Sequence, residues 1–138
     1  FPYTTLFRSE ILTSRNVEFV DVYGASGREM DHYLGNLSVA YRQRDNIGIR
    51  FFDDYASYFF IPNNFKLNNV RGKMVSLYPF PIADGIVTNG LNWELHHESL
   101  DMHGRIGTRN FARNDEVEIE FSTGAMLVFV GHSPYHAF

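Results

Sequence analysis

Residues 17–27 read VEFVDVYGASG, a short apolar segment that ends in two closely spaced glycines. The first seven residues are mostly apolar and rich in valine, which predicts a strand, and the last four predict a glycine turn. The next segment has apolar residues at positions 30, 33, 34, 37 and 41, the spacing of one stripe on a helix that runs to about residue 44. Ile47, Ile49 and Phe51 then begin another strand. This order predicts a βαβ unit with parallel strands.

The sequence after Asp53 changes to short apolar or alternating runs separated by turn residues. Residues 116–121 alternate glutamates with apolar residues and are followed by the apolar run 125–130, so we expect these two to form a hairpin. The spacing of the runs favours an antiparallel β-sandwich of jelly-roll type. The runs cover residues 55–61, 74–78, 85–91, 101–106, 116–121 and 125–130.

The expected fold class is therefore α+β, with a residual βαβ piece of an α/β nucleotide-binding domain followed by an antiparallel β-sandwich. We expect the α/β piece to cover residues 17–54, the sandwich residues 55–131 and a tail residues 132–138. Residues 1–9 show neither helical nor alternating periodicity, and we interpret residues 1–16 as a leader foreign to the fold plus a remnant.

Composition narrows the classes of function. The 138 residues are 44% hydrophobic and 20% charged, which is ordinary for a globular protein. There is no cysteine, so disulfides and thiolate sites are excluded. The net charge of −4 is not gathered into runs, which gives no support to a nucleic-acid or membrane partner. With no apolar stretch long enough to span a membrane, we expect a cytoplasmic protein that binds small molecules.

The turn at residues 24–27 leads directly into the expected helix. Free backbone N–H groups and the positive end of the helix dipole would meet there, a geometry that suits a phosphate. Asp31 and His32 fall in the first helical turn, beside that place. The alternative is a turn that only reverses the chain, with a solvated Asp31 that interacts with the dipole.

A second candidate site surrounds Trp93, the only tryptophan. Its neighbours Asn92 and Glu94 are polar, which favours a place in a pocket, whereas a lone tryptophan elsewhere is usually part of a core. Small polar residues follow in a turn at 104–110. The six histidines are scattered along the chain, and we expect no metal site built from them.

Residues 24–37, GASGREMDHYLGNL, resemble the Gly-Ala-Thr-Gly-Gly-Arg-x-Asp-His-x-Leu-x-Asn-Leu motif of bacterial thiamin pyrophosphokinases. Residues 75–80, 85–95 and 104–110 resemble, in the same order, stretches of that family's vitamin B1-binding domain. The resemblance extends over about residues 17–130. Several ordered motifs are much more specific than one.

The resemblance implies an enzyme that moves a pyrophosphoryl group from ATP to the hydroxyl of thiamin, which yields AMP and thiamin diphosphate. The family is a Mg²⁺-dependent homodimer with thiamin at the dimer interface. By position, the resemblance assigns Asp31 and His32 to catalysis. It assigns nucleotide binding to Gly24, Ser26, Gly27 and Arg28, and thiamin binding to Trp93, Thr108, Arg109 and Asn110.

The chain departs from the family pattern in three respects. The family's aspartate-rich metal and nucleotide motifs lie upstream of residue 17, so we expect most Mg²⁺ ligands to be absent and this truncated chain to be inactive alone. Glu29 stands where the family has arginine, and Arg109 replaces a small hydroxyl residue. The alternative function is a non-catalytic β-sandwich that binds a small molecule or a carbohydrate.

Overall fold

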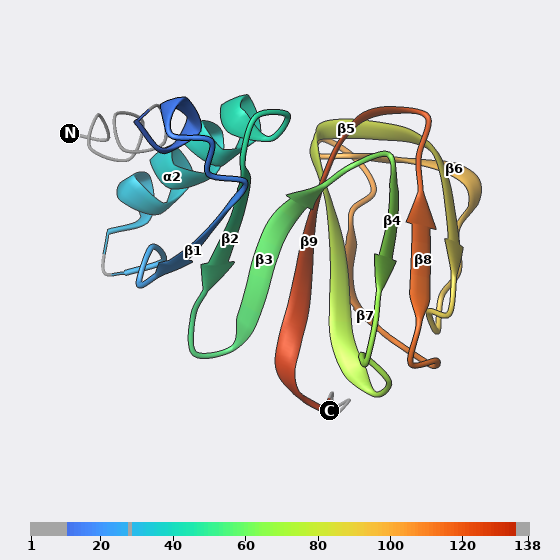
Figure 1. The fold of residues 1–138 in the computed structure, drawn as a ribbon. Helices are drawn as coiled ribbons and strands as arrows, with labels where there is room; N and C mark the ends of the chain where they lie inside the picture. The colour runs from blue at the N-terminus through green and yellow to red at the C-terminus, as the bar shows by residue number, and fades with distance from the viewer. Residues whose placement is uncertain (1–10, 28, 135–138) are drawn as a thin grey trace. The chain divides into compact units, whose positions relative to one another are not determined.

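The computed structural model describes residues 11–27 and 29–134, and it divides into two compact units after residue 60. The first unit contains helical residues 11–14 and α2, Met30–Gln43. Its strands are β1, Phe19–Tyr23, β2, Gly48–Phe52, and β3, Ala56–Ile61, whose last residue begins the second unit. β1 pairs with β2 in parallel, with α2 between them in the chain, and β2 pairs with β3 antiparallel (Figure 1).

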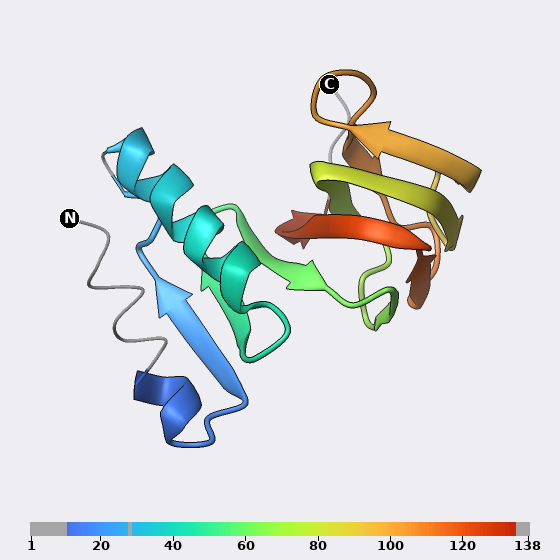
Figure 2. The ribbon, with the colours of Figure 1, turned by 90° about the horizontal axis from the view of Figure 1, so that it is seen from above.

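Helix α2 lies along one face of β1 and β2 (Figure 2). Between helix and sheet, Tyr58 of β3 is fully buried, stacks on Phe51 at 5.2 Å between ring centroids and meets the ring edge of Tyr33 at 5.9 Å. Only part of the expected apolar stripe of α2 is buried. Leu37 is buried, whereas Leu34 is 59% exposed within the described residues.

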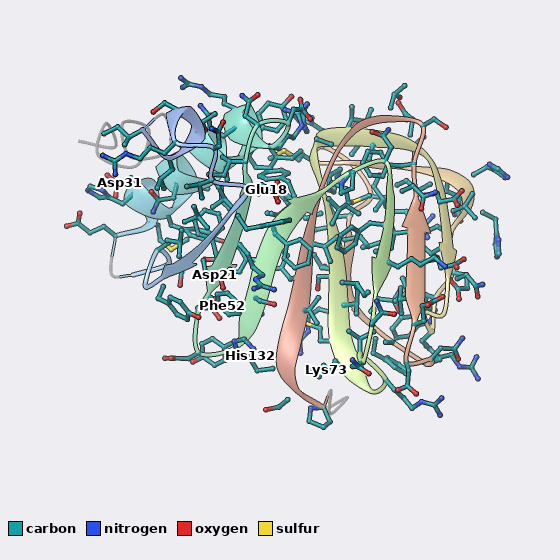
Figure 3. All side chains as sticks on the ribbon, viewed as in Figure 1. Glu18, Asp21, Asp31, Phe52, Lys73 and His132 are labelled. Atoms are coloured by element: carbon teal, nitrogen blue, oxygen red, sulfur yellow. The ribbon has the colours of Figure 1, made fainter. Side chains whose placement is uncertain are left out.

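The opposite face of the first unit carries polar and aromatic side chains from β1 and β2. The Arg50 guanidinium donates to both carboxylate oxygens of Asp21 at 3.1 Å. Tyr23 stacks on Phe52 with 5.0 Å between the centroids, and Figure 3 shows Asp21 and Phe52 on these neighbouring strands. The face is therefore ordered by contacts within the unit.

The second unit is organised around one long strand, β5, which turns over in its middle (Figure 1). β5 pairs antiparallel with β6, β7, β8 and β9, and β4 pairs with β8. The register with β9 breaks between Pro79 and Ala83, so the sheet curls over its own buried face. The strands are β4 (Asn64–Leu67), β5 (Lys73–Asn89), β6 (His96–Asp101), β7 (Gly107–Phe111), β8 (Val117–Glu120) and β9 (Thr123–Pro134).

Several sequence-based strand boundaries were wrong. The runs 74–78 and 85–91 belong to the single strand β5, because the turn residues between them sit at its bend. The run 101–106 is mostly a turn between β6 and β7, and β4 was not expected. Asp101 explains the turn, since its Oδ1 accepts a hydrogen bond from the His103 amide at 2.8 Å.

The expected hairpin of residues 116–121 with 125–130 was also wrong. β5 lies between β8 and β9 in the sheet order, and each pairs with it. The connection is held by other segments: the Phe121 amide donates to the Asn63 carbonyl and the Ser122 amide to the Asp84 carbonyl. An apolar pattern shows which side chains face inward but not which strand lies alongside.

The alternation within residues 116–121 was confirmed. Val117 and Ile119 are fully buried and Phe121 is 5% exposed, while the glutamates between them face outward. Other large residues of this core are Val75, Leu77, Ile86, Leu100, Met126, Leu127 and Val128. Among the described residues, no helix is both long and apolar enough to cross a membrane.

Candidate functional site

The first half of the glycine turn in the first unit has a defined conformation and a contact with α2. Gly24 has φ +72°, a conformation that disfavours residues with a Cβ. The Asn36 side-chain amide donates to the Ala25 carbonyl at 3.2 Å and so attaches the turn to α2. The turn directly precedes α2 in the chain, as expected for Gly24, Ser26 and Gly27. Arg28 lies outside the described residues.

Two tyrosines lie under this turn. Burial raises the pKa of Tyr33, and the neighbouring Tyr58 and Asp53 raise it further. Burial also raises the pKa of Tyr58, partly offset by a hydrogen bond with Ser26. Burial thus disfavours the ionised form of both phenols.

Asp31 and His32 are exposed in the first turn of α2, and Figure 3 shows Asp31 at its outer end. His32 Nε2 lies 3.2 Å from Glu29 Oε2. Glu29, which stands where the family motif has arginine, therefore has a partner in the same helical turn. The helix begins without a side-chain cap at Glu29. The backbone N–H groups of the first turn are thus not occupied by that side chain.

Glu29, Asp31 and His32 are the one group of metal-ligating side chains found within the described part of the chain, with ligand atoms within 4.8 Å of one another. All three are exposed. Mg²⁺ prefers one or two carboxylates together with waters and phosphate oxygens. One of these two carboxylates already contacts the imidazole, so the group fits Mg²⁺ only as a partial ligand set.

In the second unit, Trp93 is 59% exposed and its ring meets Phe111 edge-on, with centroids 5.8 Å apart. Asn110 is buried directly behind it. Asn110 Oδ1 accepts from the Trp93 amide at 3.1 Å, and its Nδ2 donates to the Trp93 carbonyl at 2.8 Å. The structure therefore brings Trp93 and Asn110 together through the backbone of Trp93.

Thr108 and Arg109 are exposed on β7, next to Asn110 in the chain. Arg109 has φ +65°, and its amide donates to Ser76 Oγ at 2.9 Å. Its guanidinium lies 3.6 Å from Met74 Sδ. The Arg109 side chain is thus held along β5 in this structure.

Glu94 was noted in the sequence only as a polar neighbour of Trp93, but it is a principal contact of the loop. Its carboxylate accepts from the Thr88 hydroxyl at 2.5 Å and from the amides of Gly90 and Leu91 at 2.7 and 2.9 Å. A cavity of about 390 Å³ opens beside it, lined in part by Asn92 and Arg113. The sequence offered one sign of this contact, which is that Glu94 lies four residues after Gly90, close enough for its side chain to return to the Gly90 amide.

The expected site residues therefore fall into two groups. Gly24, Ser26, Gly27, Asp31 and His32 lie together in the first unit, and Trp93, Thr108, Arg109 and Asn110 lie in the second.

Comparison with known families gives a match within the second unit. Residues 63–126 match the family model described as the vitamin B1 binding domain of thiamin pyrophosphokinase. Thiamine pyrophosphokinase 1 of Oryza sativa subsp. japonica is 32% identical over 108 residues, which cover 73% of this chain and 40% of that protein. Thiamine pyrophosphokinase 1 of Arabidopsis thaliana is 27% identical over 103 residues, 70% of this chain and 38% of that protein. The chain thus spans about two fifths of the length of these curated relatives.

The fold is similar to solved structures at low sequence identity. The thiamine pyrophosphokinase structure from Bacillus subtilis has a TM-score of 0.81 at 17% identity and covers 91% of this chain and 60% of its own. The structure from Candida albicans has a TM-score of 0.74 at 14% identity, with 82% and 44% covered.

Proposed function

We propose, from the premise that this chain belongs to the thiamin pyrophosphokinase family, that it is the C-terminal part of an enzyme that makes thiamin diphosphate from thiamin and ATP. In this reaction the thiamin hydroxyl oxygen bonds to the β-phosphorus of ATP. The bond from that phosphorus to the oxygen bridging to the α-phosphorus breaks, AMP leaves, and the hydroxyl proton passes to a base.

The observation that carries the proposal is Trp93, which stands 59% exposed on a hydrogen-bonded loop inside the segment that matches the vitamin B1 binding domain. Thiamin contains a flat pyrimidine and a permanently cationic thiazolium. Both ring types are attracted to an indole face. An exposed tryptophan in an ordered setting suits this ligand better than it suits a hydrophobic core.

The proposed roles follow the two groups of residues. Gly24, Ser26 and Gly27 would bind the nucleotide phosphates through backbone and hydroxyl donors, with Arg28 as a cation beside them, and Asp31 and His32 would act in catalysis at the same helix end. On the thiamin side, Trp93 would supply the ring contact. Thr108 and Arg109 would face the ligand from β7, and Asn110 would support Trp93 from below.

ATP is the proposed co-substrate, and Mg²⁺ would neutralise its phosphates when bound. Glu29, Asp31 and His32 would supply only a partial ligand set for Mg²⁺, and further carboxylates would have to come from residues outside this group. This chain's own contribution is to position phosphates at the glycine turn and the ring at Trp93.

The proposal includes the finer architecture: residues 17–54 as the end of a catalytic α/β domain and residues 55–131 as the vitamin-binding domain. The parallel pairing of β1 with β2 supports the first of these assignments. The division after residue 60 lies later than the expected boundary, because β3 pairs with β2 and so belongs almost entirely to the first unit. The curled sheet around β5 would form the two layers of the β-sandwich. A cytoplasmic location belongs to the same proposal.

A homodimer is also proposed. Ile82, Met102 and Ile106 are 38–43% exposed on neighbouring segments of the second unit, and apolar exposure of this kind favours association. Light scattering at high micromolar concentration should give twice the mass of one chain. A single-chain mass would contradict the dimer.

Thiamin titration followed by the fluorescence of the single tryptophan tests the function. We expect saturable quenching by thiamin and none by choline, which carries a permanent cation without rings. If thiamin gives no saturable change, the proposed function is wrong. Binding of oligosaccharides without thiamin would identify a carbohydrate module instead.

A further inference from the structure

The loop that carries Trp93 is closed on itself. The Thr88 amide donates to the Leu95 carbonyl at 3.1 Å, and the Leu95 amide donates to Thr88 Oγ1 at 2.9 Å. Inside this closure, Glu94 Oε1 accepts from the amides of Gly90 and Leu91, and its Oε2 accepts from the Thr88 hydroxyl. The carboxylate thus supplies acceptors that the loop backbone lacks.

The same loop is attached to β7 by a second set of hydrogen bonds. The Asn92 amide donates to the Phe111 carbonyl at 2.9 Å. Asn110, only 8% exposed, pairs with both backbone groups of Trp93, and its Oδ1 also accepts from the Phe111 amide at 2.9 Å. The Asn110 amide therefore replaces a neighbouring strand for one residue, and that residue is the exposed tryptophan.

We propose that Glu94 and Asn110 are positioning residues: they hold the loop and the backbone of Trp93 in place, so that its indole is presented against Phe111 before any ligand arrives. The ligand class is a flat aromatic ring, and only its identification as thiamin rests on the proposed function. An aromatic side chain that is already ordered loses less conformational entropy on binding, so the free ligand binds more tightly to it. The exposure of the three side chains agrees with these roles: Trp93 is exposed, Glu94 is partly buried and Asn110 is buried.

Of the two proposed positioning residues, Glu94 is the one whose contacts can be separated by substitution. Its Oε2 accepts a hydrogen bond from the Thr88 hydroxyl, while Thr88 Oγ1 itself accepts a hydrogen bond from the Leu95 amide. A glutamine at this position can still accept from Gly90 and Leu91 through its carbonyl oxygen. Its amide nitrogen cannot accept from Thr88, so that contact must rearrange.

The test uses the intrinsic fluorescence of the whole chain without ligand, since Trp93 is its single tryptophan. For Glu94→Ala we expect lower steady-state anisotropy and roughly twofold stronger quenching by acrylamide, because the indole gains motion and access. Glu94→Gln should be intermediate and so act as a partial rescue. The matched control is Glu120→Gln, a glutamate of the same unit whose side chain meets Asn64 at 3.4 Å on the surface.

Thiamin titration of the same variants gives the second readout. We expect the dissociation constant of Glu94→Ala to rise roughly tenfold through lost pre-organisation, with Glu120→Gln unchanged. Far-UV circular dichroism and the urea midpoint report whether each variant is folded. If Glu94→Ala does not fold, Thr88→Val removes one contact of the carboxylate and should shift anisotropy in the same direction.

The outcomes separate this inference from the proposed function. Unchanged anisotropy and quenching in folded Glu94→Ala and Thr88→Val would overturn the positioning role, whatever thiamin does. Changed anisotropy in a chain that shows no saturable response to thiamin would support positioning and reject the proposed ligand.

Discussion

At the level of single residues, the family resemblance assigned thiamin binding to both Trp93 and Asn110, but the two side chains differ in their surroundings. Asn110 is buried and its amide oxygen and nitrogen both bond to backbone groups, so it supports the site. Trp93 exposes most of its side chain, which excludes it from the core of the second unit. We therefore expect the indole to make the contact with a ligand.

Replacing Trp93 with alanine should consequently affect binding more than stability. We expect thiamin affinity to weaken by about 1–3 kcal/mol, the range for a lost aromatic or cation–π contact with its buried area. The unfolding free energy should change by less than about 1 kcal/mol, because an exposed side chain leaves no cavity. Calorimetric titration and urea unfolding measure the two quantities on one variant.

Tyr55→Ala is the matched control, since Tyr55 is an aromatic residue that is 83% exposed in the first unit. It should leave thiamin affinity unchanged. A large fall in the urea midpoint of Trp93→Ala, with normal thiamin affinity in the folded fraction, would show that Trp93 acts in the core instead.

At the scale of elements, the start of β9 depends on a close backbone approach. Gly124 has φ +94°, and a Cβ there would clash with the carbonyl oxygen of Ile82 on β5. Gly124→Ala should therefore lower the unfolding free energy by about 1–3 kcal/mol or more, the cost of a strained backbone plus the displaced strand.

Urea unfolding of Gly124→Ala measures this cost. Gly104→Ala is the control, because no heavy atom other than Asp101 Cβ, at 4.0 Å, lies within that distance of the added methyl. Equal midpoints for the two variants would show that β5 and β9 do not approach each other as described.

We expect the stability that the packing of α2 against β3 contributes to depend on pH. Burial raises the pKa of Tyr33 on α2, so the folded chain keeps a proton that the unfolded chain loses near pH 10. The stabilisation is therefore fully present below about pH 10 and is lost as the pH rises above it.

Tyr33→Phe should remove part of this alkaline loss. We expect the unfolding free energy of the wild type to fall more steeply between about pH 9 and 11 than that of the variant. Urea unfolding at several pH values measures the two slopes, with the exposed Tyr55→Phe as control. Identical slopes for the wild type and Tyr33→Phe would contradict a buried phenol.

At the scale of the whole molecule, the chain spans about two fifths of its curated relatives. The described residues provide a glycine turn and a partial ligand set for Mg²⁺, but ATP needs its phosphates anchored and neutralised for transfer. We therefore expect the 138-residue chain to form no thiamin diphosphate from thiamin, ATP and Mg²⁺.

Chromatographic detection of thiamin diphosphate and AMP checks this expectation. A thiamin titration on the same preparation tests whether the protein is folded and able to bind the substrate. Turnover that disappears when a chelator is added would show that the residues present here suffice to hold the metal.

The local features of the fold could be predicted from the amino-acid sequence. Valine-rich residues 17–23, the glycine turn and the helix that begins at Met30 follow from local propensity, and the burial of Val117 and Ile119 follows from alternation. The motifs indicated the family, because their order and spacing are properties of the chain alone.

How these pieces pair, and which of the expected site residues come into contact, follows only from the folded arrangement. β5 separates β8 from β9, and Asn110 reaches the backbone of Trp93 across seventeen residues. Neither follows from the sequence, because strand pairing and side-chain hydrogen bonds depend on distant segments that satisfy each other's backbone groups. Glu94 shows the limit most clearly: its role is set by the amides of Gly90 and Leu91, which only the folded loop turns toward it.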